Sequence, residues 1–174
     1  MRKVLAPLAL LMLAGCVPQV APPPPPAPAP RPLPAPAPAP TPTPTGDWRD
    51  WPLTPGDWSY RPAAGGSVSS FGVAGSDAAF TIRCDAAQRR LTLTRAGSAP
   101  GAPPMTIVTT STTRSLQSRP GAGATMTAAL AASDPLLDAM GYSRGRFVVE
   151  QAGLPVLVIP AWPEIERVTE DCRK

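Results

Sequence analysis

The chain has 174 residues, of which 27 are proline and none is histidine, and its formal net charge is +4. From Gly46 onward thirteen basic side chains face twelve acidic ones, and this near neutrality excludes the electrostatic attraction on which nucleic-acid-binding domains depend. The absence of histidine excludes Ser-His-Asp and Cys-His catalysis, and Lys174 is the only lysine after residue 3.

The first sixteen residues have the pattern of a secretory signal. Arg2 and Lys3 precede an apolar run over residues 4–13, which is too short to span a bilayer. The sequence Leu-Ala-Gly-Cys at residues 13–16 resembles the lipobox of bacterial lipoproteins. This resemblance implies that a signal peptide over residues 1–15 is cleaved and that Cys16 is acylated as the first mature residue. An ordinary signal peptide with a chance cysteine is the alternative.

The lipobox resemblance also implies a membrane partner and a location. A multiply acylated cysteine supplies enough buried methylene groups for stable anchoring. Many such lipoproteins carry an aspartate after the cysteine when they are retained at the inner membrane, but Val17 follows here. We therefore expect the periplasmic face of the outer membrane, with the inner membrane as the alternative.

Residues 16–45 form a proline-rich segment of almost only Pro, Ala and Thr. Proline lacks the amide hydrogen that helices and sheets require, so we expect a disordered, semi-rigid linker without a core. At about 3.1 Å per residue, roughly 28 residues reach about 85 Å when fully extended. A ligand for a proline-reading domain is the alternative.

Residues 46–174 are enough for one globular domain. This stretch begins with Trp48, Trp51 and Trp58, which are candidate interaction residues because tryptophan is enriched at binding surfaces. The alternative is that these rings cover one end of a small core.

Most of the domain has the alternation of half-buried antiparallel strands. We expect strands over residues 58–60, 68–73, 79–84, 90–95, 105–109, 113–117 and 125–130. Asp134 and Pro135 then predict the start of a short helix near 135–140, which Gly141 ends. Two apolar strands over 146–150 and 156–159 predict a central hairpin.

The segment before this hairpin, Ser-Arg-Gly-Arg at residues 143–146, is a compact basic loop. Arg144 and Arg146 are candidates for contact with an anionic partner, and a turn with two solvated arginines is the alternative. A last helix is predicted near 163–172, because Pro163 suits its first turn and Ile165, Val168 and Cys172 share one face.

With Cys16 committed to lipid, Cys84 and Cys172 are the remaining cysteines. An even pair in an oxidising compartment predicts a disulfide that pins the last helix to the strand ending at Cys84. A metal-binding or nucleophilic cysteine is the competing interpretation, but two cysteines without histidine form no usual zinc site. We expect no metal and no cofactor.

Two pairs of carboxylates lie one helical turn apart, namely Asp134 with Asp138 and Glu166 with Glu170. Such pairs can perform acid–base chemistry or hold a hard cation. Helix capping and solvent exposure explain both pairs far more simply, so we assign no catalytic residue.

The domain also resembles the invasion-associated locus B proteins of alphaproteobacteria. The resemblance rests on an early Trp-containing strand, a strand ending in Arg83-Cys84-Asp85, the segment at 134–140, and a terminal helix with Cys172. It implies a periplasmic, disulfide-closed, β-rich fold and transfers no functional residue.

These features predict a β-rich α+β domain, either a curved antiparallel sheet or a small sandwich with two short helices. The expected function is a membrane-anchored lipoprotein that displays an interaction or structural domain to an envelope or cell-wall partner. The alternative is a glycan-acting hydrolase or binding protein that uses paired carboxylates and tryptophan stacking. A carrier of small ligands is a third possibility.

Overall fold

The computed structural model describes residues 44–174, which form ten strands, two α-helices and one short 3-10 helix. The expected signal peptide over 1–15, the acylation site Cys16 and nearly all of the linker over 16–45 lie outside these residues. Within the described part of the chain, no helix combines the length and hydropathy of a membrane span.

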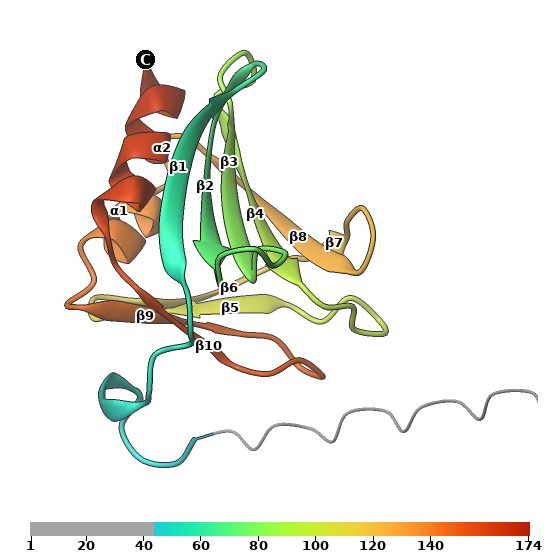
Figure 1. The fold of residues 1–174 in the computed structure, drawn as a ribbon, viewed down its shortest axis with the longest axis vertical. Helices are drawn as coiled ribbons and strands as arrows, with labels where there is room; N and C mark the ends of the chain where they lie inside the picture. The colour runs from blue at the N-terminus through green and yellow to red at the C-terminus, as the bar shows by residue number, and fades with distance from the viewer. Residues whose placement is uncertain (1–43) are drawn as a thin grey trace, which may run out of the picture. The chain divides into compact units, whose positions relative to one another are not determined.

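The strands form two antiparallel sheets (Figure 1). The first contains, in spatial order, β1 (Asp57–Ala63), β2 (Gly66–Gly72), β3 (Phe80–Asp85), β4 (Arg90–Ala96), β8 (Thr125–Ala131) and β7 (Arg119–Pro120). The second contains, in order, β10 (Leu157–Pro160), β9 (Arg146–Glu150), β5 (Met105–Val108) and β6 (Thr113–Leu116). The helices are η1 (Trp48–Asp50), α1 (Pro135–Gly141) and α2 (Pro163–Arg173).

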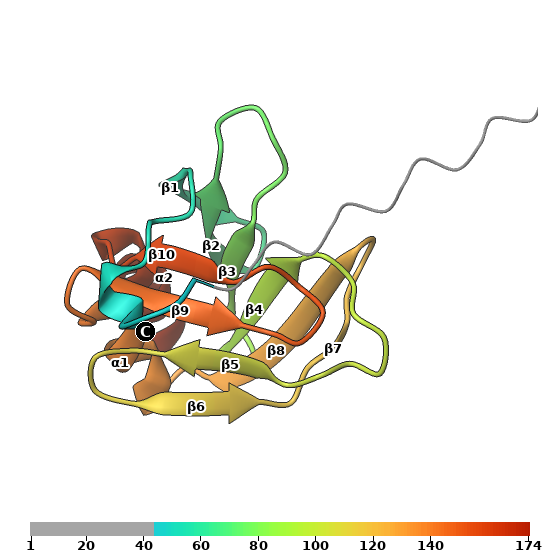
Figure 2. The same ribbon diagram turned by 90° about the horizontal axis from the view of Figure 1, so that it is seen from below.

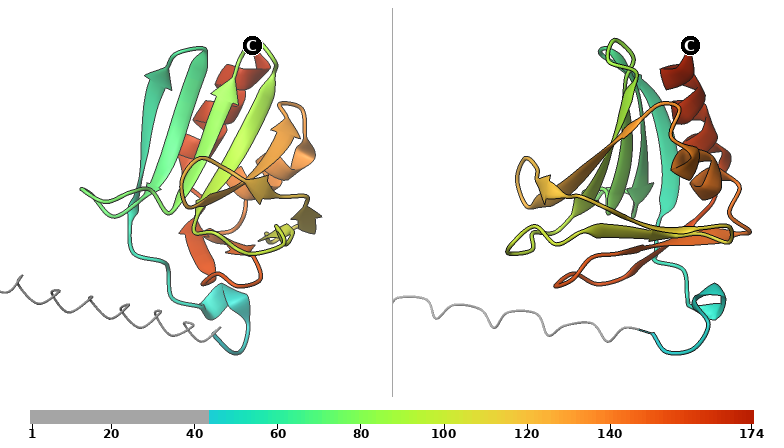
Figure 3. Two further views of the ribbon diagram at one scale, coloured as in Figure 1. Left: turned by 90° about the vertical axis from the view of Figure 1, so that its right-hand side faces the viewer. Right: turned by 180° about the vertical axis from the view of Figure 1, so that it is seen from behind.

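The strands of the smaller sheet run across those of the larger one, and one core fills the space between them (Figures 1 and 3). Alternation builds this core, because successive side chains of a strand point to opposite faces. In β4, for example, Leu91 and Leu93 point inward and are fully buried, while Thr92 and Thr94, which alternate with them, are only half-buried. Phe80 of β3 and Phe147 of β9 meet across the core with their ring centroids 6.2 Å apart.

The two helices lie together on the inner side of the larger sheet (Figure 3). Asp134 caps α1 by accepting a hydrogen bond from the amide of Leu136 at 2.9 Å, and Pro135 occupies the first turn. In α2 the buried face comprises Ile165, Val168, Thr169 and Cys172. Packing of this face closes the side of the core that neither sheet covers.

A disulfide joins Cys84 at the end of β3 to Cys172 in the last turn of α2. The Cα atoms are 5.5 Å apart, and both cysteines are almost completely buried. This is the pairing that the cysteine count predicts, and it attaches the C-terminal helix to the centre of the larger sheet.

The predicted β-rich α+β class is confirmed, with two antiparallel sheets and both expected helices. The expected hairpin also forms, but it is not central, since β10 is an edge strand. Its apolar sequence is explained by a covering segment, because the amide of Thr54 donates to the carbonyl of Val158 at 2.9 Å along this edge. The sequence patterns predicted neither η1 nor β7.

Candidate functional site

The described chain begins with a locally capped turn. The Asp47 carboxylate accepts a hydrogen bond from the amide of Arg49 at 3.0 Å, and this bond, followed by the ion pair with the Arg49 guanidinium, lowers the pKa of Asp47. The same guanidinium lies 4.7 Å from the centroid of the Trp48 ring. The sequence Asp-Trp-Arg therefore fixes its own geometry and presents an aromatic ring beneath an arginine.

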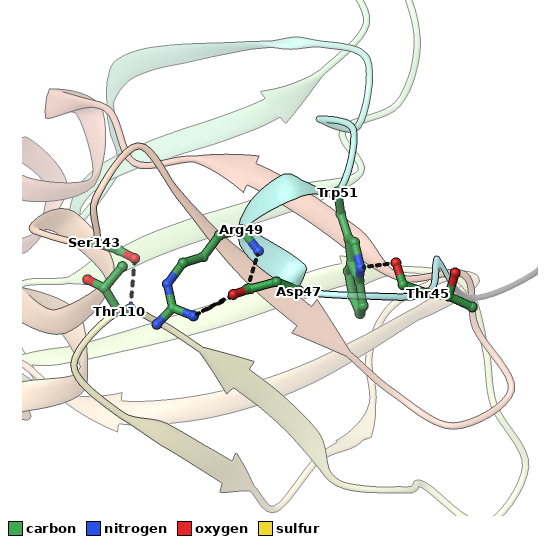
Figure 4. Close-up of polar contacts among 6 residues, drawn as sticks. All are labelled: Thr45, Asp47, Arg49, Trp51, Thr110 and Ser143. Atoms are coloured by element: carbon green, nitrogen blue, oxygen red, sulfur yellow. Dashed lines mark hydrogen bonds and ion pairs between the residues drawn. The ribbon is translucent and has the colours of Figure 1, made fainter.

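Trp51 holds this turn through two hydrogen bonds. Its indole N–H donates to the carbonyl of Thr45 at 3.3 Å, which folds the incoming chain back onto the turn (Figure 4). Its backbone carbonyl accepts a hydrogen bond from Nη1 of Arg146 at the start of β9. The segment that carries Trp48 and Trp51 is thereby attached to the basic loop, although about 95 residues separate them in sequence.

The basic loop at residues 143–146 is itself held in place. The hydroxyl of Ser143 accepts from the amide of Thr110 at 3.1 Å and donates to the carbonyl of Arg146, and the amide of Arg144 donates to the hydroxyl of Thr110 at 3.2 Å. Gly145 has φ of +79°, a conformation that glycine adopts without the steric cost of a side chain. The loop therefore has one shape, from which the Arg144 side chain projects into solvent.

The end of β10 completes the arrangement. The amide of Ala161 donates to the carbonyl of Gly145 at 3.3 Å, and Pro160 is the register partner of Arg146. The next residue, Trp162, is 41% exposed. Figure 2 shows η1 beside the ends of β9 and β10, in agreement with these contacts.

Trp58 does not belong to this surface. Only 7% of it is exposed; its ring packs on Phe71 and Phe80, and its indole N–H donates to the carbonyl of Pro160 at 2.8 Å. The hypothesis that Trp58 is an interaction residue is therefore replaced by a structural role, as the alternative interpretation of the tryptophans anticipated. The physical reason is its inward phase in β1, which the alternation in Trp58-Ser59-Tyr60 fixes.

The structure thus brings together four of the five candidate interaction residues with two further side chains. We call this the linker-side surface, and it consists of Trp48, Arg49, Trp51, Arg144, Arg146 and Trp162. Trp48, Trp51 and Arg146 are half-buried, whereas Arg49, Arg144 and Trp162 are exposed. Aromatic rings are suited to stacking, and the arginines of the same surface are suited to pairing with anions.

The first pair of carboxylates, Asp134 and Asp138, lies elsewhere and is engaged by arginines. The Asp134 carboxylate accepts hydrogen bonds from Nη1 and Nη2 of Arg114 at 2.8 and 2.6 Å. The Asp138 carboxylate accepts one from Nη1 of Arg173 at 2.8 Å. Burial acts to raise the pKa of Asp134, but the Arg114 hydrogen bonds and the Leu136 amide together hold it below its ordinary value. This aspartate therefore remains ionised, whereas a general acid must hold a proton.

The second pair, Glu166 and Glu170, lies on the surface of α2, where Glu166 is half-buried and Glu170 is exposed. Close to them, the hydroxyl of Tyr60 donates to Asp171 at 2.5 Å, and this bond is the main cause of a lowered pKa of Asp171. Asp47, Asp134 and Asp171, the described carboxyls whose pKa is displaced, are thus all displaced downward.

Sequence reasoning missed two features. The sequence suggests Trp162 only as a stacking ring of the glycan-acting alternative and not as an interaction candidate, because its exposure depends on the turn out of β10. Arg95 was overlooked although a signal was present, since alternation in β4 places it in the inward phase of Leu91 and Leu93. A charged residue at an inward position is itself informative.

Comparison with protein-family models, with curated proteins and with solved structures found no match for this chain.

Proposed function

We propose that this chain is a lipoprotein of the bacterial cell envelope that is anchored through Cys16 and presents its β-rich domain on the proline-rich segment as an interaction module. The linker-side surface is the contact region for its partner. The hydrogen bond from Arg146 to the carbonyl of Trp51 is the observation that carries this proposal, because it unites two candidate segments into one ordered surface.

The composition of this surface indicates the kind of partner. Arg144 is exposed and forms no ion pair within residues 44–174, so its charge is available to an anion. Trp162 offers an exposed ring. It directly follows Ala161, whose amide is hydrogen-bonded to Gly145 of the same loop. A partner with carboxylates or phosphates next to flat apolar groups fits this pattern, and envelope proteins and cell-wall strands both present such groups.

The alternative function, a glycan-acting protein, receives support only in its binding form. An exposed tryptophan suits the face of a sugar ring. Hydrolysis requires two carboxylates across a groove, one of them with a raised pKa. The ion-paired Asp134 and Asp138 favour binding over cleavage, because each already has an arginine as its partner.

The anchor is tested separately from the surface. Cells that produce the full chain are labelled with a palmitate analogue, and the mature N-terminal peptide is identified by mass spectrometry. We expect acylated Cys16 at the mature N-terminus and complete loss of label in Cys16→Ser. An unlabelled mature protein that begins at another residue contradicts the proposed anchor while leaving the surface untouched.

The surface is tested by crosslinking in intact envelopes with two variants and two matched controls. Arg144→Ser and Trp162→Ser alter the linker-side surface. Arg61→Ser and Val73→Ser remove an exposed arginine and an exposed apolar side chain elsewhere, Val73 being 52% exposed. We expect one crosslinked partner whose yield falls in the first two variants only.

A yield that falls equally in all four variants, or in none, contradicts the assignment of the surface. Recovery of cell-wall fragments instead of a protein identifies the glycan-binding alternative. Release of soluble sugars by the purified protein favours the hydrolase.

A further inference from the structure

The outer edge of the larger sheet is formed by β1, which pairs with β2 on one side only. The left panel of Figure 3 shows β1 as the outermost strand, with no helix or other strand of the described chain beyond it. Among the edge strands within residues 44–174, β1 has seven residues, β6 and β10 have four each, and β7 has two. A long open edge is a template for a further strand, and most proteins cover or shorten such edges.

The register of β1 with β2 determines which backbone groups face outward. Ala63 and Gly66 are paired on either side of a two-residue turn, so they exchange hydrogen bonds, and bonded and non-bonded pairs alternate from there along the strand. The amides and carbonyls of Trp58 and Tyr60 therefore point away from β2. Pro62 has the same phase, which suits proline because it has no amide hydrogen to donate.

A contact on the far side of β2 agrees with this phase. Phe71 lies opposite Trp58, and its carbonyl accepts from the amide of Ala79 at 2.8 Å, on the side of β3. This carbonyl is thus turned away from β1. Within residues 44–174, the outward amides and carbonyls of Trp58 and Tyr60 form no backbone hydrogen bond. The edge of β1 therefore offers donors and acceptors to a strand that aligns beside it.

The outer face of this edge carries one charge of each sign. Asp57, Ser59 and Arg61 are exposed and alternate with the buried Trp58 and the half-buried Tyr60, so they share the outer face. Within the described part of the chain, neither Asp57 nor Arg61 forms an ion pair. The two charges flank Ser59 at equal distance in sequence, and this symmetry suits a partner strand of the same sequence.

We propose that two copies of this chain associate through antiparallel pairing of their β1 strands about a two-fold axis at Ser59. In this register Trp58 of each copy lies opposite Tyr60 of the other, so that the open amides and carbonyls form hydrogen bonds. Asp57 of each copy lies opposite Arg61 of the other, at non-hydrogen-bonded positions where facing side chains are closest. The two larger sheets then form one continuous sheet.

The charges favour this register over its neighbours. The open backbone groups of both strands also face each other when the axis moves by one residue in either direction. An axis at residue 58 places Asp57 opposite Ser59. An axis at residue 60 places Arg61 opposite Ser59 and sets Pro62 against an open carbonyl to which it cannot donate. Neither alternative places opposite charges face to face.

The contact is the same on both copies, so association closes at two copies. No residue of the linker-side surface belongs to β1. The dimer is therefore independent of the proposed envelope partner, and its test does not involve that partner.

The test uses the purified full chain with Cys16→Ser, which removes the cysteine outside the disulfide of Cys84 with Cys172. Analytical ultracentrifugation over a concentration series is expected to show a reversible equilibrium between monomer and dimer. Asp57→Arg and Arg61→Asp each place like charges opposite one another in both pairs, and each should weaken the dimer by about tenfold or more.

An equimolar mixture of these two variants provides the decisive comparison. Each variant then meets the opposite charge on the other in both pairs, so the mixture should form a heterodimer about as stable as the original dimer. The double variant with both reversals should recover as well. Circular dichroism of each variant verifies that the domain is folded, which is expected because both side chains are exposed.

The register is measured by disulfide formation. Ser59→Cys places a thiol at the two-fold axis, where facing Cα atoms are about 4.5 Å apart and within the range of a disulfide. Ser115→Cys is the matched control, since it alters an exposed serine on the edge strand β6. We expect a covalent dimer with Ser59→Cys only.

Three outcomes overturn the proposal. The first is a chain that stays monomeric at every concentration up to about 1 mM. The second is a dimer that neither charge reversal weakens, or one that the mixture of the two variants does not restore. The third is equal crosslinking of the Ser59→Cys and Ser115→Cys variants.

Discussion

Replacement of both Cys84 and Cys172 by alanine removes the covalent link between β3 and α2 without leaving an unpaired thiol. The two residues are 88 positions apart in sequence. For a closed loop of this length, the chain-entropy model gives about 4.5 kcal/mol of stabilisation at 25 °C. In a domain of this size each kcal/mol corresponds to about 3–4 °C, so we expect the melting temperature to fall by about 15 °C.

The assay is urea unfolding of wild type and variant, followed by circular dichroism in oxidising buffer and again with reductant. In oxidising buffer the variant should unfold at a much lower urea concentration, and with reductant the wild type should approach it. Cys84→Ser and Cys172→Ser should each lose nearly the full amount, because either substitution opens the same loop. Equal unfolding midpoints for wild type and double variant in oxidising buffer would refute the reasoning.

Three further results are expected. Arg146→Met should release the segment around Trp51, because it removes a charged hydrogen bond worth about 1.5–3 kcal/mol. Limited proteolysis with mass spectrometry should then detect earlier cleavage within residues 44–56. The melting temperature of the core should stay constant. Asp134→Asn keeps the helix cap but loses the charge opposite Arg114, so it should cost about 0.5–1 kcal/mol at pH 6. Because the folded pKa of Asp134 is lowered, this difference should be complete above about pH 5 and should be lost as the pH falls below the ordinary aspartate pKa of about 3.9 and through the folded pKa, as paired urea titrations would measure. Trp58→Ala should destabilise the domain by about 3–5 kcal/mol and Trp162→Ala by less than about 0.5 kcal/mol, and similar losses in thermal melts would contradict the assigned burial.

Local patterns predicted the fold well where the alternation of apolar residues agreed with the capping and turn residues at the ends of an element. The alternation through Phe80, Ile82 and Cys84 located β3, and Asp134 with Pro135 located the start of α1, because both signals arise from interactions within a few residues. The order of strands was not accessible in this way. The covering of the β10 edge depends on Thr54, which is about 104 residues distant and has no local signature.

The candidate surface was only partly predictable for the same reason. Residue type alone identified the tryptophans and the basic loop as candidates. It did not distinguish the buried Trp58 from the more exposed Trp48 and Trp51, because burial of an aromatic ring depends on the residues that pack against it. The contact between Arg146 and Trp51 joins segments that no pattern connects. The buried position of Arg95 was detectable in principle, because the alternation in β4 points this charged side chain toward the core.

The attachment of the first described residues along β10 also determines how tension on the linker would travel through the domain. A pull from residue 44 loads first the contact of Thr45 with Trp51, then that of Trp51 with Arg146 and the paired hydrogen bonds of Thr54 with Val158 at 2.9 Å, and only afterwards β1. Unravelling from this end reaches a covalent stop at Cys84, because the disulfide ties that residue to α2. If the proposed anchor and partner pull against each other, the chain would therefore lengthen by peeling one edge, while the segment between the two cysteines keeps its closed length.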